Sequence, residues 1–194
     1  MKTDKYMSNL ADKIKYIRRD LSLLFKTPKA YLFSFTFSPH KKIRVAPYNP
    51  KVTSAGKELV SRLQHLLPNL KVYFVGAASL GIAQGDGDID LLIESPYKDF
   101  DKYLPSLISV LGTPDKKRDM FIEWHTTWKG HQIELTLSDP SSPIFREPLA
   151  GYALLKSNPK YLKEYEQMKI SSNGLSEREY KKRKLEFFNR VAKI

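Results

Sequence analysis

Apolar residues recur every three or four positions over several stretches of the chain, a spacing that is typical of amphipathic helices. The first stretch runs from Asp4 to Phe25, with Lys and Arg between the apolar positions. The next predicted helix has Thr53 or Ser54 as its N-terminal cap, and the last one begins with a capping box of Ser176 and Glu179. After the first stretch, helices are predicted over about 53–67, 99–111, 144–156, 159–169 and 176–193.

Shorter runs rich in β-branched and aromatic residues predict strands. These runs cover 71–75, 88–94 and a hairpin of 119–127 and 131–137 that turns at Lys129-Gly130. The aromatic-rich run 30–37 is predicted to be a strand or an extended covering segment. Together these elements predict an α+β fold in which a mixed β-sheet has flanking helices, an N-terminal amphipathic helix and a C-terminal helical segment.

The length of 194 residues suits one domain with a hydrophobic core and a helical appendage. We expect residues 1–39 to form an N-terminal extension, 40–142 the core, and 143–194 a helical segment packed on that core. The composition, 41% hydrophobic and 12% aromatic, is that of a globular chain and excludes a disordered one.

The absence of cysteine excludes disulfide bonds and thiolate metal sites, and it favours a reducing, cytoplasmic setting. The first residues contain too many charges for a signal peptide, and no apolar run has the length of a membrane span. The net charge of +12 is concentrated at the ends, since residues 1–50 have 11 basic and 3 acidic side chains while 51–150 have 11 and 13. Such basic ends would attract a nucleoside triphosphate, RNA or an anionic surface, although a generally lysine-rich surface is an equal explanation.

The densest cluster of chemically functional residues lies between 71 and 94. On the strand 88–94, the period of two places Asp88 and Asp90 on the same face. Two carboxylates so close repel each other unless a cation lies between them, and oxygen ligands favour a hard divalent ion such as Mg²⁺. Gly76 allows the backbone to approach a phosphate closely, and Ser79 offers a hydroxyl beside it. The cluster predicts a site for a metal-bound triphosphate.

Gly76-Ala77, ten further residues and Asp88-Ile89-Asp90 resemble the G-S-x10-D-x-D signature of the nucleotidyltransferase superfamily, which has the polymerase-β-like fold. The spacing is kept, but Ala77 replaces the usual Ser. Gly87 also stands where minimal members often have Ser. The resemblance implies a third acid on a strand beside the D-x-D strand, for which Glu134 is the first candidate and Glu123 its rival.

A closer resemblance is to the GrpB-like family of this superfamily. Its motifs are Val45-Ala46-Pro47-Tyr48-Asn49-Pro50, Ser142-Pro143, Phe145-Arg146, Leu155-Lys156-Ser157-Asn158-Pro159, Glu164-Tyr165-Glu166, Lys169, Tyr180, Lys184 and Phe187. The resemblance covers about residues 43–192. Family members commonly have histidines where this chain has Gln132-Ile133-Glu134, and His125 and His131 are interpreted here as structural or substrate-lining.

The resemblance implies transfer of a nucleoside monophosphate from a nucleoside triphosphate (NTP) to an acceptor hydroxyl. Asp88, Asp90 and Glu134 would hold Mg²⁺ or Mn²⁺. The phosphates would be bound by Gly76, Ala77 and Ser79, with a cationic contact from Arg146, Lys181 or Lys184.

The acceptor is open in this interpretation, with RNA or a nucleotide among the options. One alternative, favoured by Ala77, is a catalytically weak module that binds nucleotide or RNA. Another is a protein that docks on a partner through its N-terminal helix, for which packing of that helix on the core is the commoner arrangement.

Overall fold

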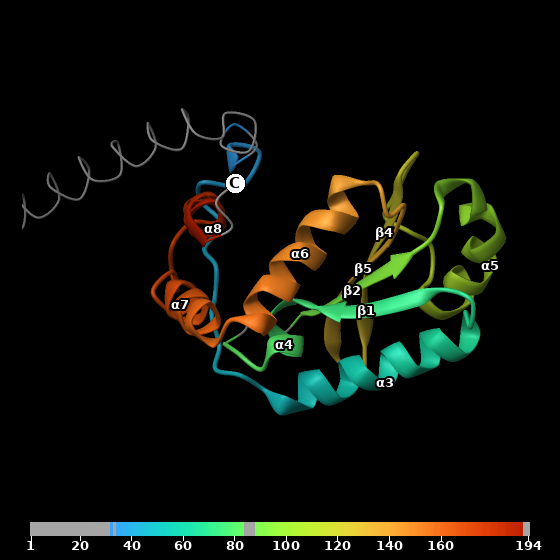
Figure 1. Ribbon diagram of the computed structural model, residues 1–194, viewed down its shortest axis with the longest axis horizontal. Helices are drawn as coiled ribbons and strands as arrows, with labels where there is room; N and C mark the ends of the chain where they lie inside the picture. Colours follow the sequence, from blue (N-terminus) through green and yellow to red (C-terminus); the bar gives the residue numbers. More distant parts are fainter. Residues whose placement is uncertain (1–31, 33, 84–87, 192–194) are drawn as a thin grey trace, which may run out of the picture. The chain divides into compact units, whose positions relative to one another are not determined.

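The computed structural model of the chain describes residue 32 and residues 34–83 and 88–191 (Figure 1). The chain divides into two compact units, a larger one of Arg44–Asn173 and a smaller one of Met1–Ile43 with Gly174–Ile194. The helix predicted over 4–25 lies outside the described residues. Residues 143–173 belong to the larger unit, and residues 174–194 belong to the smaller one.

A mixed β-sheet forms the centre of the larger unit (Figure 1). β2 and β5 are parallel, and the other neighbouring strands are antiparallel. The predicted α+β fold with a mixed sheet is therefore confirmed. In the order β1-β2-β5-β4-β3, the strands are β1 (Lys71–Val75), β2 (Ile89–Glu94), β5 (His131–Ser138), β4 (Phe121–Trp128) and β3 (Lys116–Arg118).

The main hydrophobic core lies on one face of the sheet, under α3 (Pro50–Leu66) and α5 (Phe100–Leu111), with η1 (Tyr97–Asp99) leading into α5. Every second residue of the central strands points into this core, as the period-two pattern predicts. The core residues that are at most 1% exposed include Leu59 and Leu63 of α3, Leu107 of α5, Ile89, Leu91 and Ile93 of β2, and Leu135 and Leu137 of β5. We call this side the core face.

The opposite face of the sheet is covered in part by α6 (Pro143–Ser157), and we call it the polar face. Phe145 of α6 packs against Val75 and Leu92, and its ring centroid lies 5.7 Å from that of Tyr73. Beyond this small apolar cluster, the side chains on the same face of the strands are mostly polar or charged. Figure 1 shows α6 crossing this side of the sheet, with α4 (Gly76–Leu80) following the end of β1.

The helix before β1 begins earlier than predicted. Its cap is Asn49, whose side chain accepts a hydrogen bond from the Lys51 N–H at 3.0 Å, and neither Thr53 nor Ser54 is the cap. Pro50 occupies the first helical position, where the missing N–H leaves nothing unsatisfied and the fixed φ suits a helix. The predicted start was wrong because Thr53 uses its hydroxyl for another contact, described below.

The other predicted helices and strands of the larger unit are confirmed within one or two residues at each end. The last two helices there are α6 and α7 (Pro159–Ile170). The short strand β3 was missed, since its sequence Lys116-Lys117-Arg118 is charged throughout and has no hydrophobic period. It pairs through its backbone with residues 121–123 of β4.

In the smaller unit, α8 (Glu177–Val191) is the described helix after residue 173. The predicted extended run 30–37 is wrong in its described part, because Leu32 and Ser34 are helical and a turn follows them. The aromatic rings that suggested a strand lie beside cations of α8, with the Arg178 guanidinium 5.1 Å from the Phe35 centroid. Across the described residues, no helix is both long and apolar enough to cross a membrane.

Candidate functional site

Four strands place one residue each in a row across the polar face. The register pairs Val75 of β1 with Asp90 of β2, Asp90 with Glu134 of β5, and Glu134 with His125 of β4. Directly paired residues project from the same face, and neighbouring strands lie about 4.8 Å apart. The row therefore brings the carboxylates of Asp90 and Glu134 onto adjacent positions of one surface.

Gly76 lies directly against the side chain of Asp90. Its φ is +75°, a conformation that side chains other than glycine rarely adopt. A Cβ atom added to Gly76 would overlap the Asp90 carboxylate, with Cγ at 2.6 Å and the Asp90 Cβ at 2.9 Å. Glycine is thus required at position 76 for two reasons: the turn from β1 into α4 has a positive φ, and the Asp90 carboxylate leaves no room for a side chain.

Asp88 directly precedes β2, which begins at Ile89 rather than at Asp88. Asp88 and Asp90 are both half-buried, and Glu134 is exposed. Because Asp88 lies outside the strand, its place on the same face as Asp90 stays a prediction. The carboxylate oxygens of these three residues are the type of donor that a hard divalent cation takes.

Glu123, the rival of Glu134, lies in a different row, opposite Thr136. Its carboxylate is held by the Lys116 ammonium at 2.5 Å and lies 3.4 Å from Nε2 of His125. Of the two glutamates, Glu134 is therefore the direct neighbour of Asp90. Within the described part of the chain, no three His, Asp or Glu side chains are grouped closely enough to hold a metal ion.

His125 is held by Asp115, which directly precedes β3. The Asp115 carboxylate accepts the backbone N–H of His125 and lies 3.3 Å from its Nδ1. The pKa of Asp115 lies below its ordinary value, chiefly because of that backbone hydrogen bond. Sequence reasoning missed Asp115, since a single acid in a loop gives no periodic signal.

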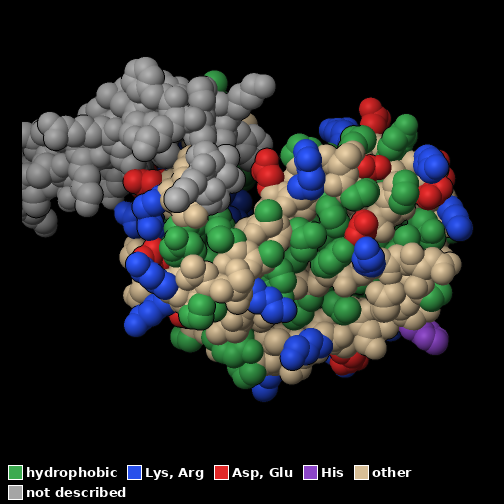
Figure 2. All heavy atoms as spheres, in the orientation of Figure 1, with side chains coloured by type: hydrophobic (Ala, Val, Ile, Leu, Met, Phe, Trp, Pro, Cys, Tyr) green, Lys and Arg blue, Asp and Glu red, His purple; other side chains and the backbone are tan. Residues whose placement is uncertain are grey.

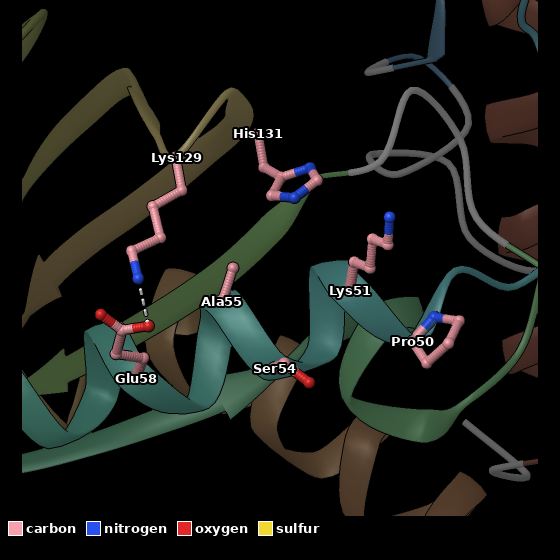
Figure 3. Close-up of a pocket in the computed structure, with 7 residues that line it drawn as sticks. All are labelled: Pro50, Lys51, Ser54, Ala55, Glu58, Lys129 and His131. Atoms are coloured by element: carbon pink, nitrogen blue, oxygen red, sulfur yellow. Dashed lines mark hydrogen bonds and ion pairs between the residues drawn. The ribbon is translucent and has the colours of Figure 1, made fainter.

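His131, in contrast, begins β5 on the core-face side, two residues before the buried Ile133. It lines an open hollow of about 390 Å³ at the start of α3 (Figure 3). Figure 3 shows His131 and Lys51 directed over this hollow, with Lys129 paired to Glu58 at 2.6 Å. The alternation along β5 puts His131 and Glu134 on opposite faces, so the hollow is separate from the carboxylate row.

The predicted phosphate-binding residues lie in or at the start of α4. The Ser79 hydroxyl donates to the Gly76 carbonyl at 2.9 Å. After α4, the backbone N–H of Ala83 donates to the Glu166 carboxylate of α7 at 2.9 Å. Ala77 follows Gly76 in the same turn. Glu166 was not predicted as a contact of this turn, because it is far away in the sequence.

The predicted cationic residues lie on different elements. Arg146 is exposed in the first turn of α6, a helix that follows the C-terminal end of β5, whereas Glu134 is in the N-terminal half of that strand. Lys181 and Lys184 are on α8 and so belong to the smaller unit. In Figure 2, basic and acidic side chains are scattered among hydrophobic ones over the visible face of the larger unit.

Comparisons with known proteins give three findings. The family described as GrpB protein matches residues 42–193. A UPF0157 protein of Vibrio cholerae serotype O1 is 28% identical over 130 residues, which are 65% of this chain and 68% of that protein.

Solved structures of Cid1, described as having RNA terminal uridylyl transferase activity and as a poly(U) polymerase, match with 15% identity and TM-scores of 0.47 and 0.45. The matches cover 74% and 73% of this chain but only 43% and 45% of the Cid1 chains, so the chain spans less than half of their length. A likeness at this score and identity does not extend the substrates of Cid1 to this chain.

Proposed function

The chain belongs to the GrpB family, as its motifs predicted, and from its carboxylate row we propose that it is a metal-dependent nucleotidyltransferase. It moves a nucleoside monophosphate from an NTP to an acceptor hydroxyl and releases pyrophosphate. The family match covers most of the chain, including α3, the sheet and all later described helices.

One observation supports the proposal most strongly. Asp90 lies beside Glu134 in the sheet register and against a glycine whose missing side chain makes room for the carboxylate. A structural sheet has no need for two adjacent acids on one face, because like charges directly opposite each other are destabilising. A divalent cation that Asp88, Asp90 and Glu134 share with the phosphates of a bound nucleotide would remove that repulsion, since Mg²⁺ is usually bound by one or two carboxylates together with substrate phosphates.

The reaction follows from these positions. When bound, the metal neutralises charge on the α-phosphate and lowers the pKa of the acceptor hydroxyl. The acceptor oxygen forms a bond to the α-phosphorus, the bond from the α-phosphorus to the bridging oxygen breaks, and pyrophosphate leaves. Glu134, which is exposed, accepts the hydroxyl proton.

The turn after β1 contacts the phosphates in this proposal. Gly76 and Ala77 offer backbone N–H groups, and Ser79 offers its hydroxyl. Within the larger unit, Arg146 is the predicted cation for the charge compensation.

The charge distribution supports an anionic acceptor such as RNA or a nucleotide. Residues 44–173 contain 16 basic and 15 acidic side chains, so the unit with the carboxylate row is nearly neutral. Residues 1–43 and 174–194 contain 17 basic and 6 acidic side chains. The smaller unit therefore has the electrostatic character of a polyanion-binding surface.

A second candidate is a module of the same fold that binds nucleotide or RNA with weak or no transfer activity. Ala77 favours it, because this position lacks the hydroxyl of the superfamily signature. Binding that survives the loss of Asp88 and Asp90 and does not need Mg²⁺ is the behaviour expected of such a module.

The experiment is a thermal-shift assay of the wild type and of the Asp88→Asn/Asp90→Asn variant with ATP, GTP, CTP and UTP, each with and without Mg²⁺. Asp99→Asn/Asp101→Asn is the matched control, since it removes the same charges at the same D-x-D spacing near the start of α5. We expect one nucleotide to stabilise the wild type and the control only with Mg²⁺, and the Asp88/Asp90 variant not at all. An equal response of all three proteins would overturn the proposal.

A further inference from the structure

Two hydroxyls connect the start of α3 to α4. The Tyr48 hydroxyl donates to Thr53 Oγ1 at 3.0 Å, and the Thr53 hydroxyl donates in turn to the backbone carbonyl of Ala78 at 2.6 Å. Tyr48 also reaches Gly81 just beyond α4, since a Cβ on that glycine would lie 4.0 Å from the tyrosine ring. Tyr48 and Thr53 thus contact both the middle and the end of α4.

The Ala78 carbonyl needs this contact. In a longer helix the N–H of Ile82 would donate to it, but that N–H donates to the Ala77 carbonyl at 3.3 Å. Ala78 is only 1% exposed, and a buried carbonyl without a partner is unfavourable. The Thr53 hydroxyl is therefore the group that satisfies α4 from outside, at a length typical of a strong O–H to oxygen hydrogen bond.

The position of α4 decides the position of Gly76, because Gly76 is the first residue of α4. Gly76 in turn lies against the Asp90 carboxylate with no room for even one more carbon atom. A shift of α4 by a fraction of an ångström would open this contact or press on Asp90. The chain of contacts from Tyr48 through Thr53 and α4 thus ends at the carboxylate row.

We infer that Thr53, supported by Tyr48, is a positioning residue for the metal and nucleotide site: it holds α4 so that Gly76 keeps Asp90 in its binding orientation. This inference rests on the proposed function. It also gives a physical role to the Pro47-Tyr48-Asn49-Pro50 segment, which places Tyr48 and begins α3 at Pro50 with Asn49 as the cap. Groups that support metal ligands from behind typically change metal affinity about 10- to 100-fold when they are removed.

The test compares Thr53→Val, which replaces the hydroxyl by a methyl group of similar size, with Thr53→Ser, which keeps the hydroxyl. The probes are Mn²⁺ alone and the Mn²⁺ complexes of ATP, GTP, CTP and UTP, measured by isothermal titration well below the unfolding temperature. Thr53→Val should weaken binding of the preferred complex about tenfold, whereas Thr53→Ser should stay within about twofold of the wild type. Tyr48→Phe should have an effect between these two, since Thr53 keeps its bond to Ala78.

Ser172→Ala separates positioning from loss of stability. Ser172 is fully buried and its hydroxyl donates to the Met168 carbonyl at 2.7 Å, so the variant removes a bond of the same kind elsewhere in the larger unit. It should lower the unfolding temperature as Thr53→Val does, yet leave the dissociation constant unchanged.

The possible outcomes distinguish the two claims. If the wild type binds a complex and Thr53→Val binds it equally well, the positioning role is refuted while the proposed function stands. The same holds if Ser172→Ala weakens binding as much as Thr53→Val, because the effect then follows stability. If the wild type binds none of the probes, the proposed function fails and the positioning role fails with it.

Discussion

Replacing Gly76 by alanine tests the closest contact of the candidate site. The variant places a Cβ at a φ of +75°, which disfavours an L-residue by about 1–2 kcal/mol. The same atom overlaps the Asp90 carboxylate, and forced overpacking of this kind typically costs about 1–3 kcal/mol more. We expect Gly76→Ala to lower the free energy of unfolding by about 2–5 kcal/mol in urea denaturation.

Gly130→Ala is the matched control for the backbone contribution. Gly130 has a φ of +80°, and an added Cβ meets no atom within 4 Å. This variant should therefore show only the conformational cost, about 1–2 kcal/mol. The difference between the two variants measures the overlap with Asp90.

A double-mutant cycle checks that Asp90 is the group responsible. Asp90→Ala removes the two atoms nearest to the added Cβ, so Gly76→Ala should be less destabilising in that background than in the wild type. If Gly76→Ala costs no more than Gly130→Ala, or if the cycle shows no coupling, the close packing of Gly76 on Asp90 is wrong.

Three further predictions concern single side chains. Glu134→Gln should stabilise the metal-free protein by about 1 kcal/mol at pH 8, because it removes the water-screened repulsion of two charges about 5 Å apart. It should also abolish the thermal shift that Mg²⁺ and nucleotide produce together. A loss of stability would contradict the pairing of Glu134 with Asp90. The hydroxyl and the N–H of Ser141 lower the pKa of Asp139, so its stabilising contribution is present above about pH 4 and is lost as the pH falls below that value. Urea denaturation should accordingly show a difference between the wild type and Asp139→Asn that shrinks on acidification, and a constant difference would refute this. Burial, and then the hydrogen bond to Glu94, raise the pKa of Tyr73 to about 12. Neutral Tyr73 therefore stabilises the fold fully below about pH 10 and loses this effect as the pH rises through about 12. Ultraviolet difference titration against Tyr73→Phe should show this ionisation, and in Glu94→Gln its pKa should be lower but still above the ordinary value of tyrosine.

Much of the larger unit could be predicted because its hydrophobic periods report burial directly. β1 matches its predicted range, and β2 differs only in starting one residue later, at Ile89. The start of α3 could not be predicted, since Asn49, Thr53 and Ser54 are all suitable caps and only the tertiary contact of Thr53 with Ala78 separates them. The run 30–37 failed for a related reason, because aromatic residues that contact cations of a helix resemble a strand in sequence.

The place of Asp90 on the polar face follows from the period of a strand, but its neighbours do not. Glu123 and Glu134 each lie between apolar residues on predicted strands, so the pattern alone treats them alike. The pairing of Asp90 with Glu134 depends on the strand order and register, which no local period contains. Asp115, Thr53 and Glu166 each make a hydrogen bond to a backbone group of another segment, and such contacts leave no trace in the sequence.

A crystal structure with Mn²⁺ and a non-hydrolysable NTP analogue would test the proposed site most directly, with the anomalous signal locating the ion. We expect a peak on the polar face, about 2.1 Å from carboxylate oxygens of Asp90 and Glu134 and next to the analogue's phosphates. A peak elsewhere, or a bound analogue with no ion between these two acids, would contradict it.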